Sequence, residues 1–291
     1  MDGYIKKWKG LGARFDVVRG LNMQEKTTMG VGGACEYALL PKDTRSLAVM
    51  AADGFTVLGA CSNVIVGDGG ANAFVFTGNL CGVRVEGTDV FAECGVSLPR
   101  LARLTADYGL TGLEPLSGVP GTVGGAVKMN AGCFGTEIGR LVRSVVIAGP
   151  DGIKEVDGLE MDFSYRYSRV DELGTVLKVR LGLSKGSPDA SRSMIAEYAK
   201  QRRERFPQGK SAGCYFRRVD GISSGYFIEK AGLKGLKIGG AAVSDKHAAF
   251  IVNLGGATAY DVRTLADIVK EEVRRTSGIV LQEEVEYYGK F

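Results

Sequence analysis

Two glycine-rich segments contain the residues whose types and spacing are best suited to hold a ligand. Gly118–Gly135 reads GVPGTVGGAVKMNAGCFG, with Lys128 as its one charged residue, and Leu58–Gly70 reads LGACSNVIVGDGG. Glycine allows a ligand to approach the main chain, and successive N–H groups form a concave site for an anion. The two segments could therefore hold the two phosphates of a dinucleotide. Tight turns in a β-rich core would explain each segment equally well.

Neither segment contains one of the common nucleotide-binding motifs. The chain has no GxxxxGK[ST] sequence, which argues against a P-loop. GTVGGAV matches GxGxxG only loosely, and the strand–helix–strand setting that this motif needs is not apparent. The type of ligand therefore stays open at this point.

The remaining reactive side chains argue against a metal site. His247 is the single histidine, which excludes a His-rich site and disfavours a Ser-His-Asp triad. The six cysteines form no CxxC pair, so a structural zinc site is also disfavoured and we expect no metal. Lys200–Phe206, KQRRERF, is the densest basic run. We interpret it as a solvated helix face, in which one arginine could contact a phosphate-bearing ligand.

Composition excludes several other classes of protein. The net charge of the 291 residues is +4, and Lys and Arg form no stripe interleaved with aromatic residues, so we expect no nucleic-acid partner. No apolar run approaches the roughly 18 residues that span a membrane, and the first residues, MDGYIKKWKG, do not resemble a secretory segment. We therefore expect a cytoplasmic protein with reduced thiols and no membrane partner.

Apolar runs separated by Gly and Asp predict a strand-rich first part of the chain, up to about residue 184. Short strands are predicted at 37–41, 55–60, 73–78, 83–87, 90–95, 141–149, 152–156 and 176–183. Hairpins are expected to join many of them. The remainder of the chain is predicted to be α+β and to end in a strand over 279–289.

Three helices are predicted from their end signals and apolar periodicity. The first is Ser97–Leu110, for which Ser97 is a suitable N-cap. The second is the polar helix Ser187–Phe206, which has a proline at its start. The third, Thr258–Gly278, repeats apolar residues at helical spacing and has Gly278 as its C-cap.

Taken together and in order, several stretches closely resemble the UDP-N-acetylenolpyruvoylglucosamine reductases, FAD enzymes of bacterial cell-wall synthesis. The stretches are TTMGVGG (27–33), LGACSN (58–63), GLEPLSGVPGTVGGAVKMNAGCFGTEI (112–138), FSYRYS (163–168), SAGCYFRRV (211–219), YFIEKAGLKGLKIGGAAVSDKHAAFIVN (226–253) and LQEEV (281–285). The resemblance covers nearly the whole chain. The short run over 213–231 is similar to the shorter branch of the family, which lacks an extra tyrosine-bearing loop.

The resemblance implies an α+β fold of the PCMH or vanillyl-alcohol-oxidase type. Two α+β subdomains within residues 1–184, with their core at about 30–184, would bind FAD, and residues 185–291 would form a substrate-binding domain. Contacts to FAD are implied for Gly59, Cys61, Ser62, Asn63, Gly118, Gly121, Thr122, Gly124, Gly125, Asn130, Ala131 and Gly132.

The reaction implied by the resemblance is the reduction of an enolpyruvyl ether to a lactyl ether, which yields UDP-N-acetylmuramate. NADPH would reduce FAD, and flavin N5 would deliver hydride to the methylene carbon of the substrate. Arg166 matches the arginine that meets the substrate carboxylate, and Glu284 matches the glutamate that helps to stabilise or protonate the intermediate. Cys214 matches the proton donor.

The chain departs from the family pattern at four positions. Cys214 stands where serine is usual, and a thiol gives up its proton more readily than an alcohol. Arg217 stands where lysine is common, which keeps the charge but replaces a point charge by a fork of donors, and Val219 stands where proline is common. In the segment Leu58–Gly70, Cys61 stands where the family usually has glycine, so a positive φ at this position would strain the cysteine backbone.

Other polar residues in the motifs receive weaker predictions. Tyr165, Arg205 and Arg217 are possible substrate contacts. His247 is expected to be structural, Lys246 and Asn253 could serve substrate binding or packing, and Glu283 and Glu286 are expected to be solvated.

Small-molecule substrates and a monomeric chain are expected. Two alternatives stay open, an FAD-dependent oxidase on a related fold and a nucleotide-binding module without catalysis.

Overall fold

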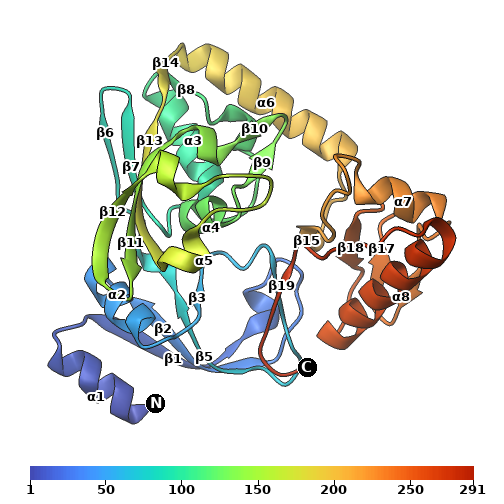
Figure 1. Ribbon diagram of the computed structural model, residues 1–291, viewed down its shortest axis with the longest axis horizontal. Coiled ribbons are helices and arrows are strands. Elements are labelled where there is room, and N and C mark those ends of the chain that lie inside the picture. Colours follow the sequence, from blue (N-terminus) through green and yellow to red (C-terminus); the bar gives the residue numbers. More distant parts are fainter. The chain divides into compact units, whose positions relative to one another are not determined.

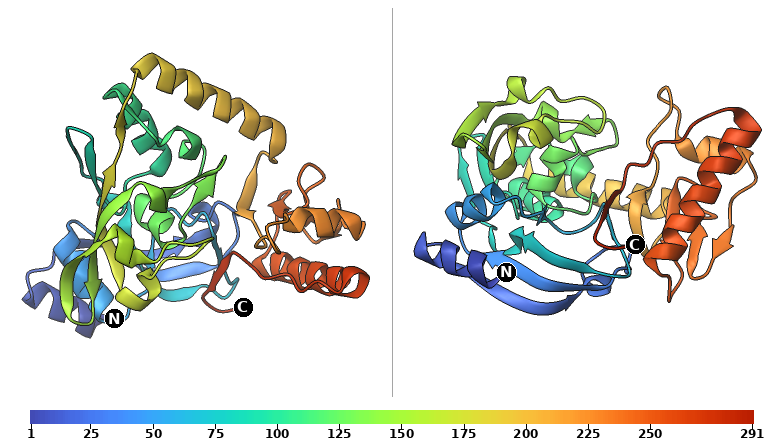
Figure 2. Two further views of the ribbon diagram at one scale, coloured as in Figure 1. Left: turned by 45° about the horizontal axis from the view of Figure 1, so that its top comes forward. Right: turned by 60° about the horizontal axis from the view of Figure 1, so that its bottom comes forward.

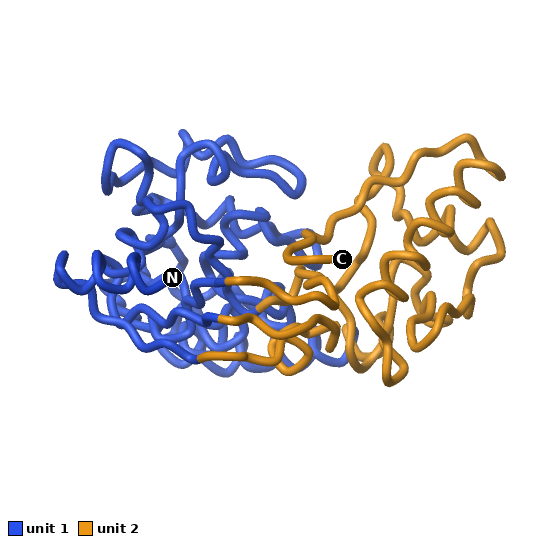
Figure 3. Tube along the Cα trace, turned by 90° about the horizontal axis from the view of Figure 1, so that it is seen from below, with its two compact units in different colours: residues 1–18, 37–60, 73–201 blue, residues 19–36, 61–72, 202–291 orange.

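The computed structural model describes residues 1–291 and divides the chain into two compact units, each built from segments far apart in the sequence (Figure 3). Unit 1 comprises residues 1–18, 37–60 and 73–201, and unit 2 comprises residues 19–36, 61–72 and 202–291. The mixture of helices and sheets confirms the predicted α+β class. The predicted division at residue 184 stays a prediction. None of the helices has the length and apolar character needed to cross a lipid bilayer.

The largest sheet of unit 1 has five antiparallel strands, visible in Figure 1. Its order is β12 (Gly152–Asp157), β11 (Val142–Gly149), β13 (Thr175–Gly182), β7 (Asp89–Glu93) and β6 (Val83–Glu86). Hairpins join β6 to β7 and β11 to β12, as the Gly- and Asp-containing turns predict. Val145, Ile147 and Val179 are fully buried or nearly so and form part of the core of this unit.

The rest of the chain before residue 206 contains a second sheet, six α-helices and two short strand pairs. A four-stranded sheet with residues in both units has the order β1 (Phe15–Asn22), β2 (Ala34–Pro41), β5 (Ala71–Phe76) and β3 (Val57–Leu58). The remaining helices before residue 206 are α1 (Asp2–Gly10), α2 (Thr44–Ala52), α3 (Leu98–Asp107), α4 (Val123–Lys128), α5 (Val170–Leu173) and α6 (Pro188–Arg205). Two short pairs are β8 (Leu110–Thr111) with β14 (Ser184–Lys185), and β9 (Gly132–Cys133) with β10 (Thr136–Glu137).

Sequence signals at helix ends located α3 and α6 well. Ser97 caps α3, because its side chain accepts a hydrogen bond from the Arg100 amide at 3.4 Å. The prediction of a strand over 55–60 was too long, since only Val57–Leu58 pairs with a neighbour. The helices α1 and α2 were not predicted.

Unit 2 contains a four-stranded antiparallel sheet covered by helices (Figure 2). Its order is β15 (Lys210–Cys214), β18 (Phe250–Asn253), β17 (Ala241–Val243) and β16 (Lys237–Ile238), and its helices are α7 (Ser224–Lys230) and α8 (Ala259–Ser277). The apolar face of α8, including Val262 and Val269, is completely buried. Gly278 ends α8 with φ of 72°, as predicted.

The last part of the chain corrects one prediction. A strand over 279–289 was expected, but only β19 (Glu286–Tyr288) is regular, and it pairs in parallel with β4 (Val64–Val66). Before β19 the backbone bonds to a different partner, since Arg217 N–H donates to the Gln282 carbonyl at 2.8 Å. The segment changes partners within a few residues and therefore cannot form one continuous strand.

Candidate active site

The centre of the segment Gly118–Gly135 is the short helix α4, which its glycine content had concealed. The Thr122 side chain caps this helix by accepting from the Gly125 amide at 3.3 Å. The first two backbone amides of α4 also have hydrogen-bond partners within the chain. Val123 N–H donates to the Val96 carbonyl at 2.8 Å, and Gly124 N–H donates to the Cys94 carbonyl at 2.9 Å. A Cβ at Gly124 would lie 2.8 Å from the Cβ of Cys94, so this glycine allows close packing of α4.

The two glycine-rich segments meet within unit 1. A Cβ added to Gly59 would lie 2.4 Å from Oγ1 of Thr122, which only glycine avoids. The amides of Gly118, Gly121 and Thr122 donate to no backbone carbonyl. Three such donors, beside the close packing of Gly59 on the Thr122 side chain, are suited to an anionic group, and the arrangement fits the phosphates of a dinucleotide.

In the segment Leu58–Gly70, residues 61–70 belong to unit 2, and they include a residue with a strained backbone, Cys61. Cys61 is buried with φ of 50°, so the positive φ considered in the sequence analysis is present. Burial raises the pKa of its thiol to about 12. The Cys61 carbonyl accepts from the Thr28 amide at 3.3 Å, and the Thr28 hydroxyl donates to the Ser211 carbonyl at 2.7 Å. The half-buried Ser62 follows.

Asn63 connects this loop to the segment that contains Glu284. Its Nδ2 donates to the Glu284 carbonyl at 2.9 Å, and its own carbonyl accepts from the Glu286 amide at 3.0 Å. The side chain of Asn63 is therefore part of the support for Glu284. Nothing in the sequence indicated this role.

Cys214 and Glu284 lie on adjacent backbone segments of unit 2. The ladder between β15 and β18 shifts register between Ser211 and Cys214, and Gly213 in this bulge has φ of 82°. Tyr215, which follows Cys214, accepts from the Glu284 amide at 2.8 Å. Oε2 of Glu284 is buried. The structure thus brings together two backbone segments, carrying Cys214 and Glu284, that the sequence separates by 70 positions (284 − 214).

Arg166 occupies a tight turn in unit 1. Ser164 and Tyr167 exchange two backbone hydrogen bonds of 3.2 and 3.1 Å, and Arg166 between them has φ of 55°. The third position of such a turn favours glycine, so the arginine backbone is strained. Nη1 of Arg166 lies 3.6 Å from the position of a Cβ added to Gly132, and Cζ lies 5.2 Å from the centre of the Tyr165 ring. The guanidinium therefore lies against the glycine-rich segment.

The residues predicted as possible substrate contacts have accessible side chains. Tyr165 is 40% exposed, Arg205 is exposed at the end of α6, and Arg217 is half-buried. Tyr165 belongs to unit 1, whereas Arg205 and Arg217 belong to unit 2.

Two predictions about polar neighbours were incomplete or wrong. Glu283 is not simply solvated, because Oε1 forms an ion pair with Lys270 at 2.9 Å. Glu286 accepts a hydrogen bond from the Tyr288 hydroxyl.

His247 packs against the rings of Phe206 and Phe250, and burial lowers its pKa, which agrees with the structural role expected for it.

Lys246 and Asn253 have internal partners. Lys246 Nζ donates to the Arg203 carbonyl, and Asn253 Nδ2 donates to the carbonyls of Met29 and Gly30 at 3.0 and 3.2 Å. These contacts support packing rather than substrate binding.

Comparison with known proteins gives consistent matches. Residues 204–288 match the family model described as UDP-N-acetylenolpyruvoylglucosamine reductase, C-terminal domain, and residues 44–155 match the model described as FAD binding domain. A UDP-N-acetylenolpyruvoylglucosamine reductase from Caldicellulosiruptor bescii is 40% identical, covering 92% of this chain and 90% of the relative. One from Streptococcus pneumoniae is 37% identical, covering 89% and 90%.

A solved structure is similar over nearly the whole chain. The crystal structure of UDP-N-acetylenolpyruvylglucosamine reductase (MurB) from Thermus caldophilus superposes with a TM-score of 0.82 at 35% sequence identity. The similarity covers 95% of this chain and 99% of that chain.

Proposed function

Because the chain belongs to the UDP-N-acetylenolpyruvoylglucosamine reductase family, we propose that it reduces UDP-N-acetylenolpyruvoylglucosamine to UDP-N-acetylmuramate with FAD as cofactor and NADPH as reductant. One observation in the structure carries the proposal most directly. Cys214, a proton-bearing side chain, and Glu284, a carboxyl group with a buried oxygen, lie on backbone segments joined by a hydrogen bond.

FAD would be held by the two glycine-rich segments. The amides of Gly118, Gly121 and Thr122 are the donors for its phosphates, and Gly59 lets the Thr122 side chain pack closely against the other segment. From the segment Leu58–Gly70, Cys61, Ser62 and Asn63 would also contact FAD. From the segment Gly118–Gly135 the proposal adds Gly124, Gly125, Ala131, Gly132 and the backbone of Asn130. When bound, FAD supplies the hydride that the reduction of the enolpyruvyl double bond requires.

Three side chains of the chain would act on the substrate. Hydride addition to the methylene carbon leaves negative charge on the neighbouring carbon and its carboxylate. Arg166 is always charged and presents a fork of donors that can neutralise the carboxylate. Cys214 would deliver the proton to the neighbouring carbon, and Glu284 would stabilise or help to protonate the intermediate. The two hydrogens added, one as hydride and one as proton, balance the reduction.

The remaining parts of the chain complete the proposal. Tyr165, Arg205 and Arg217 are proposed substrate contacts. Residues 1–184 would serve FAD binding and residues 185–291 substrate binding. A monomeric cytoplasmic enzyme, with a UDP-sugar as its small-molecule partner, is proposed.

The experiment is anaerobic oxidation of NADPH by the FAD-loaded protein, with and without UDP-N-acetylenolpyruvoylglucosamine. We expect sustained NADPH consumption only when the sugar nucleotide is present, with a product two hydrogens heavier by mass spectrometry. Consumption that stops after one equivalent despite the sugar nucleotide would instead indicate a binding module. Turnover that depends on oxygen and not on the sugar nucleotide would indicate an oxidase.

A further inference from the structure

The side chain of Asn130 is fully engaged inside unit 1. Asn130 is 1% exposed, and its Oδ1 accepts from the Gly139 amide at 3.0 Å. Its Nδ2 donates to the Ser164 carbonyl at 2.8 Å and to Oε2 of Glu137 at 3.3 Å. An amide group has two donors and one acceptor oxygen, so no donor of this side chain is left for a ligand.

Two partners of Asn130, Ser164 and Glu137, lie near Arg166. Ser164 opens the turn in which Arg166 is held, and its N–H and carbonyl form the two bonds of that turn with Tyr167. The side chains of Glu137 and Arg166 both lie against Gly132, at 2.9 Å (Cγ) and 3.6 Å (Nη1) from an added Cβ. Asn130 therefore holds both Ser164, where the turn begins, and Glu137, whose side chain lies near the guanidinium of Arg166.

A second contact closes the other end of the turn. The hydroxyl of the buried Ser168 donates to the Lys128 carbonyl at 2.9 Å, at the end of α4. The Ser164–Tyr167 turn is thus tied to the glycine-rich segment on both sides. Its two anchors are Lys128, the last residue of α4, and Asn130, two residues further along the chain.

The backbone of this region needs such support. Arg166 has φ of 55° and Asn130 itself has φ of 40°. Residues other than glycine keep such conformations only where the surrounding structure over-determines them. Asparagine tolerates this region better than most residues, since its short polar side chain bonds to nearby backbone.

We propose that Asn130 is a positioning residue for Arg166, and that its amide holds the Ser164–Tyr167 turn so that the guanidinium is presented to the substrate carboxylate. This inference rests on the proposed function. It assigns the side chain of Asn130 to the substrate step and not to FAD binding, so any contact of Asn130 with FAD would be through its backbone.

The test combines Asn130→Gly with Arg166→Lys in a double-mutant cycle. Glycine adopts φ of 40° without strain, so Asn130→Gly removes the amide and spares the backbone. FAD affinity is measured by flavin fluorescence. The two half-reactions are measured separately by anaerobic stopped flow, as flavin reduction by NADPH and as flavin reoxidation by UDP-N-acetylenolpyruvoylglucosamine.

If Asn130 acts through Arg166, Asn130→Gly slows the limiting rate of reoxidation by at least about tenfold. FAD affinity and the rate of reduction by NADPH stay within about twofold of wild type. The double variant reoxidises at the rate of Arg166→Lys alone, within about twofold, because the positioned group is already altered.

Other outcomes overturn the inference. Independent effects that multiply in the double variant, or a tenfold loss of FAD affinity in Asn130→Gly, would show that Asn130 does not act through Arg166. Should Asn130→Gly fail to fold by circular dichroism, Asn130→Asp keeps Oδ1 for the Gly139 amide but sets an oxygen against the Ser164 carbonyl and Oε2 of Glu137, and slower reoxidation is again expected. A wild-type protein whose flavin is not reoxidised by the sugar nucleotide would overturn the proposed function, and this inference with it.

Discussion

At the scale of single residues, strained backbone conformations gather at the proposed site. Six residues other than glycine have positive φ, and Cys61, Asn130 and Arg166 are among them. All three were predicted as site residues from the motifs. The sequence raised the question of positive φ only for Cys61, because glycine is usual there. Nothing in the side chain of an arginine or asparagine reveals the φ that its neighbours impose.

The buried cysteines provide a prediction about pH. Burial is the main cause that raises the pKa of Cys61 and Cys94 to about 12, so both thiols stay protonated as the pH rises to 9. About one molecule in a thousand would then carry the reactive thiolate. We expect iodoacetamide at pH 9 to label neither residue in the folded protein, as mapped by mass spectrometry. Both should label rapidly in urea, and rapid labelling of either in the native protein would contradict the described burial.

At the scale of elements, helix ends were the most readable feature of the sequence. Ser97 and Gly278 perform the capping roles predicted for them, and Thr258, the first residue of the third predicted helix, is the N-cap of α8. The helix α4 was missed because glycine disfavours helices in isolation, whereas here Thr122 and the close packing on Cys94 stabilise it. Tertiary contacts outweighed local propensity at that position.

Asp68, which is distant in sequence from α8, caps the start of this helix, and this contact predicts an effect on stability. The Asp68 carboxylate accepts from the amides of Ala259 and Tyr260, at 2.8 and 2.9 Å, at the start of α8. Asp68→Ala should lower the free energy of unfolding by about 1 kcal/mol, measured by urea denaturation.

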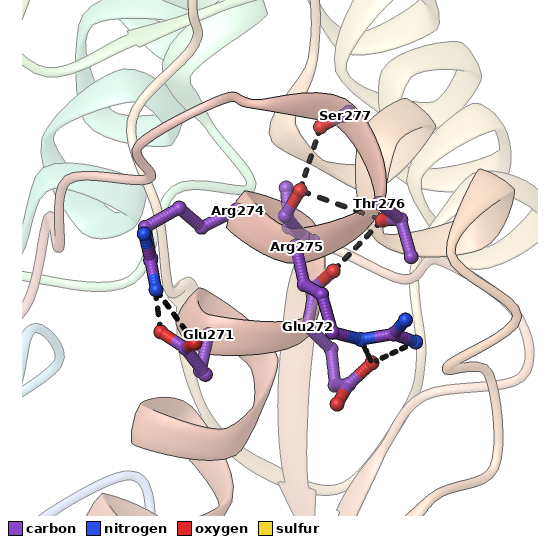
Figure 4. Close-up of polar contacts among 7 residues, drawn as sticks. Glu271, Glu272, Arg274, Arg275, Thr276 and Ser277 are labelled. Atoms are coloured by element: carbon purple, nitrogen blue, oxygen red, sulfur yellow. Dashed lines mark hydrogen bonds and ion pairs between the residues drawn. The ribbon is translucent and has the colours of Figure 1, made fainter.

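The opposite end of α8 offers a matched control for the Asp68 experiment. Glu271 pairs with Arg274, and Glu272 with Arg275, on the exposed surface of the helix (Figure 4). Glu271→Ala should leave the urea midpoint unchanged, because solvent screens this exposed pair. Equal midpoints for Asp68→Ala and wild type would show that the cap does not stabilise α8.

Close approach of the two glycine-rich segments predicts an effect on cofactor affinity. An alanine at position 59 would put its Cβ 2.4 Å from Oγ1 of Thr122, so either the segments move apart or the Thr122 side chain leaves its capping position on α4. We expect Gly59→Ala to weaken FAD binding by at least about tenfold in a fluorescence titration. Gly78→Ala is the control, since a Cβ there meets nothing within 4 Å. Equal FAD affinity in the two variants would argue against a phosphate site beside Gly59.

At the scale of the whole molecule, each unit draws on distant segments. In unit 2, β19 pairs with β4, Asp68 caps α8, and Asn63 bonds to Glu284. The family resemblance implied most of the site residues and the general fold. Strand periodicity could not reveal a parallel pairing over more than two hundred residues, because pairing partners leave no local pattern.

The interleaving of segments predicts how a fragment behaves. Residues 185–291 alone lack β4 and Asp68, so the fragment loses the partner of β19 and a cap of α8. We expect no cooperative thermal transition for this fragment by circular dichroism, whereas the full chain should unfold cooperatively. A cooperative transition of the fragment near the midpoint of the full chain would show that these contacts are dispensable.

The most direct test of the proposed chemistry is anaerobic reoxidation of the reduced flavin by UDP-N-acetylenolpyruvoylglucosamine, compared between wild type and Cys214→Ala. The account predicts rapid reoxidation in wild type and a rate lower by at least about a hundredfold in Cys214→Ala, with FAD binding and reduction by NADPH retained. Cys214→Ser, which keeps a proton on a small side chain, should recover much of the rate. An unchanged rate in Cys214→Ala would contradict the assignment of Cys214 as proton donor, and a wild-type flavin that stays reduced would contradict the reductase itself.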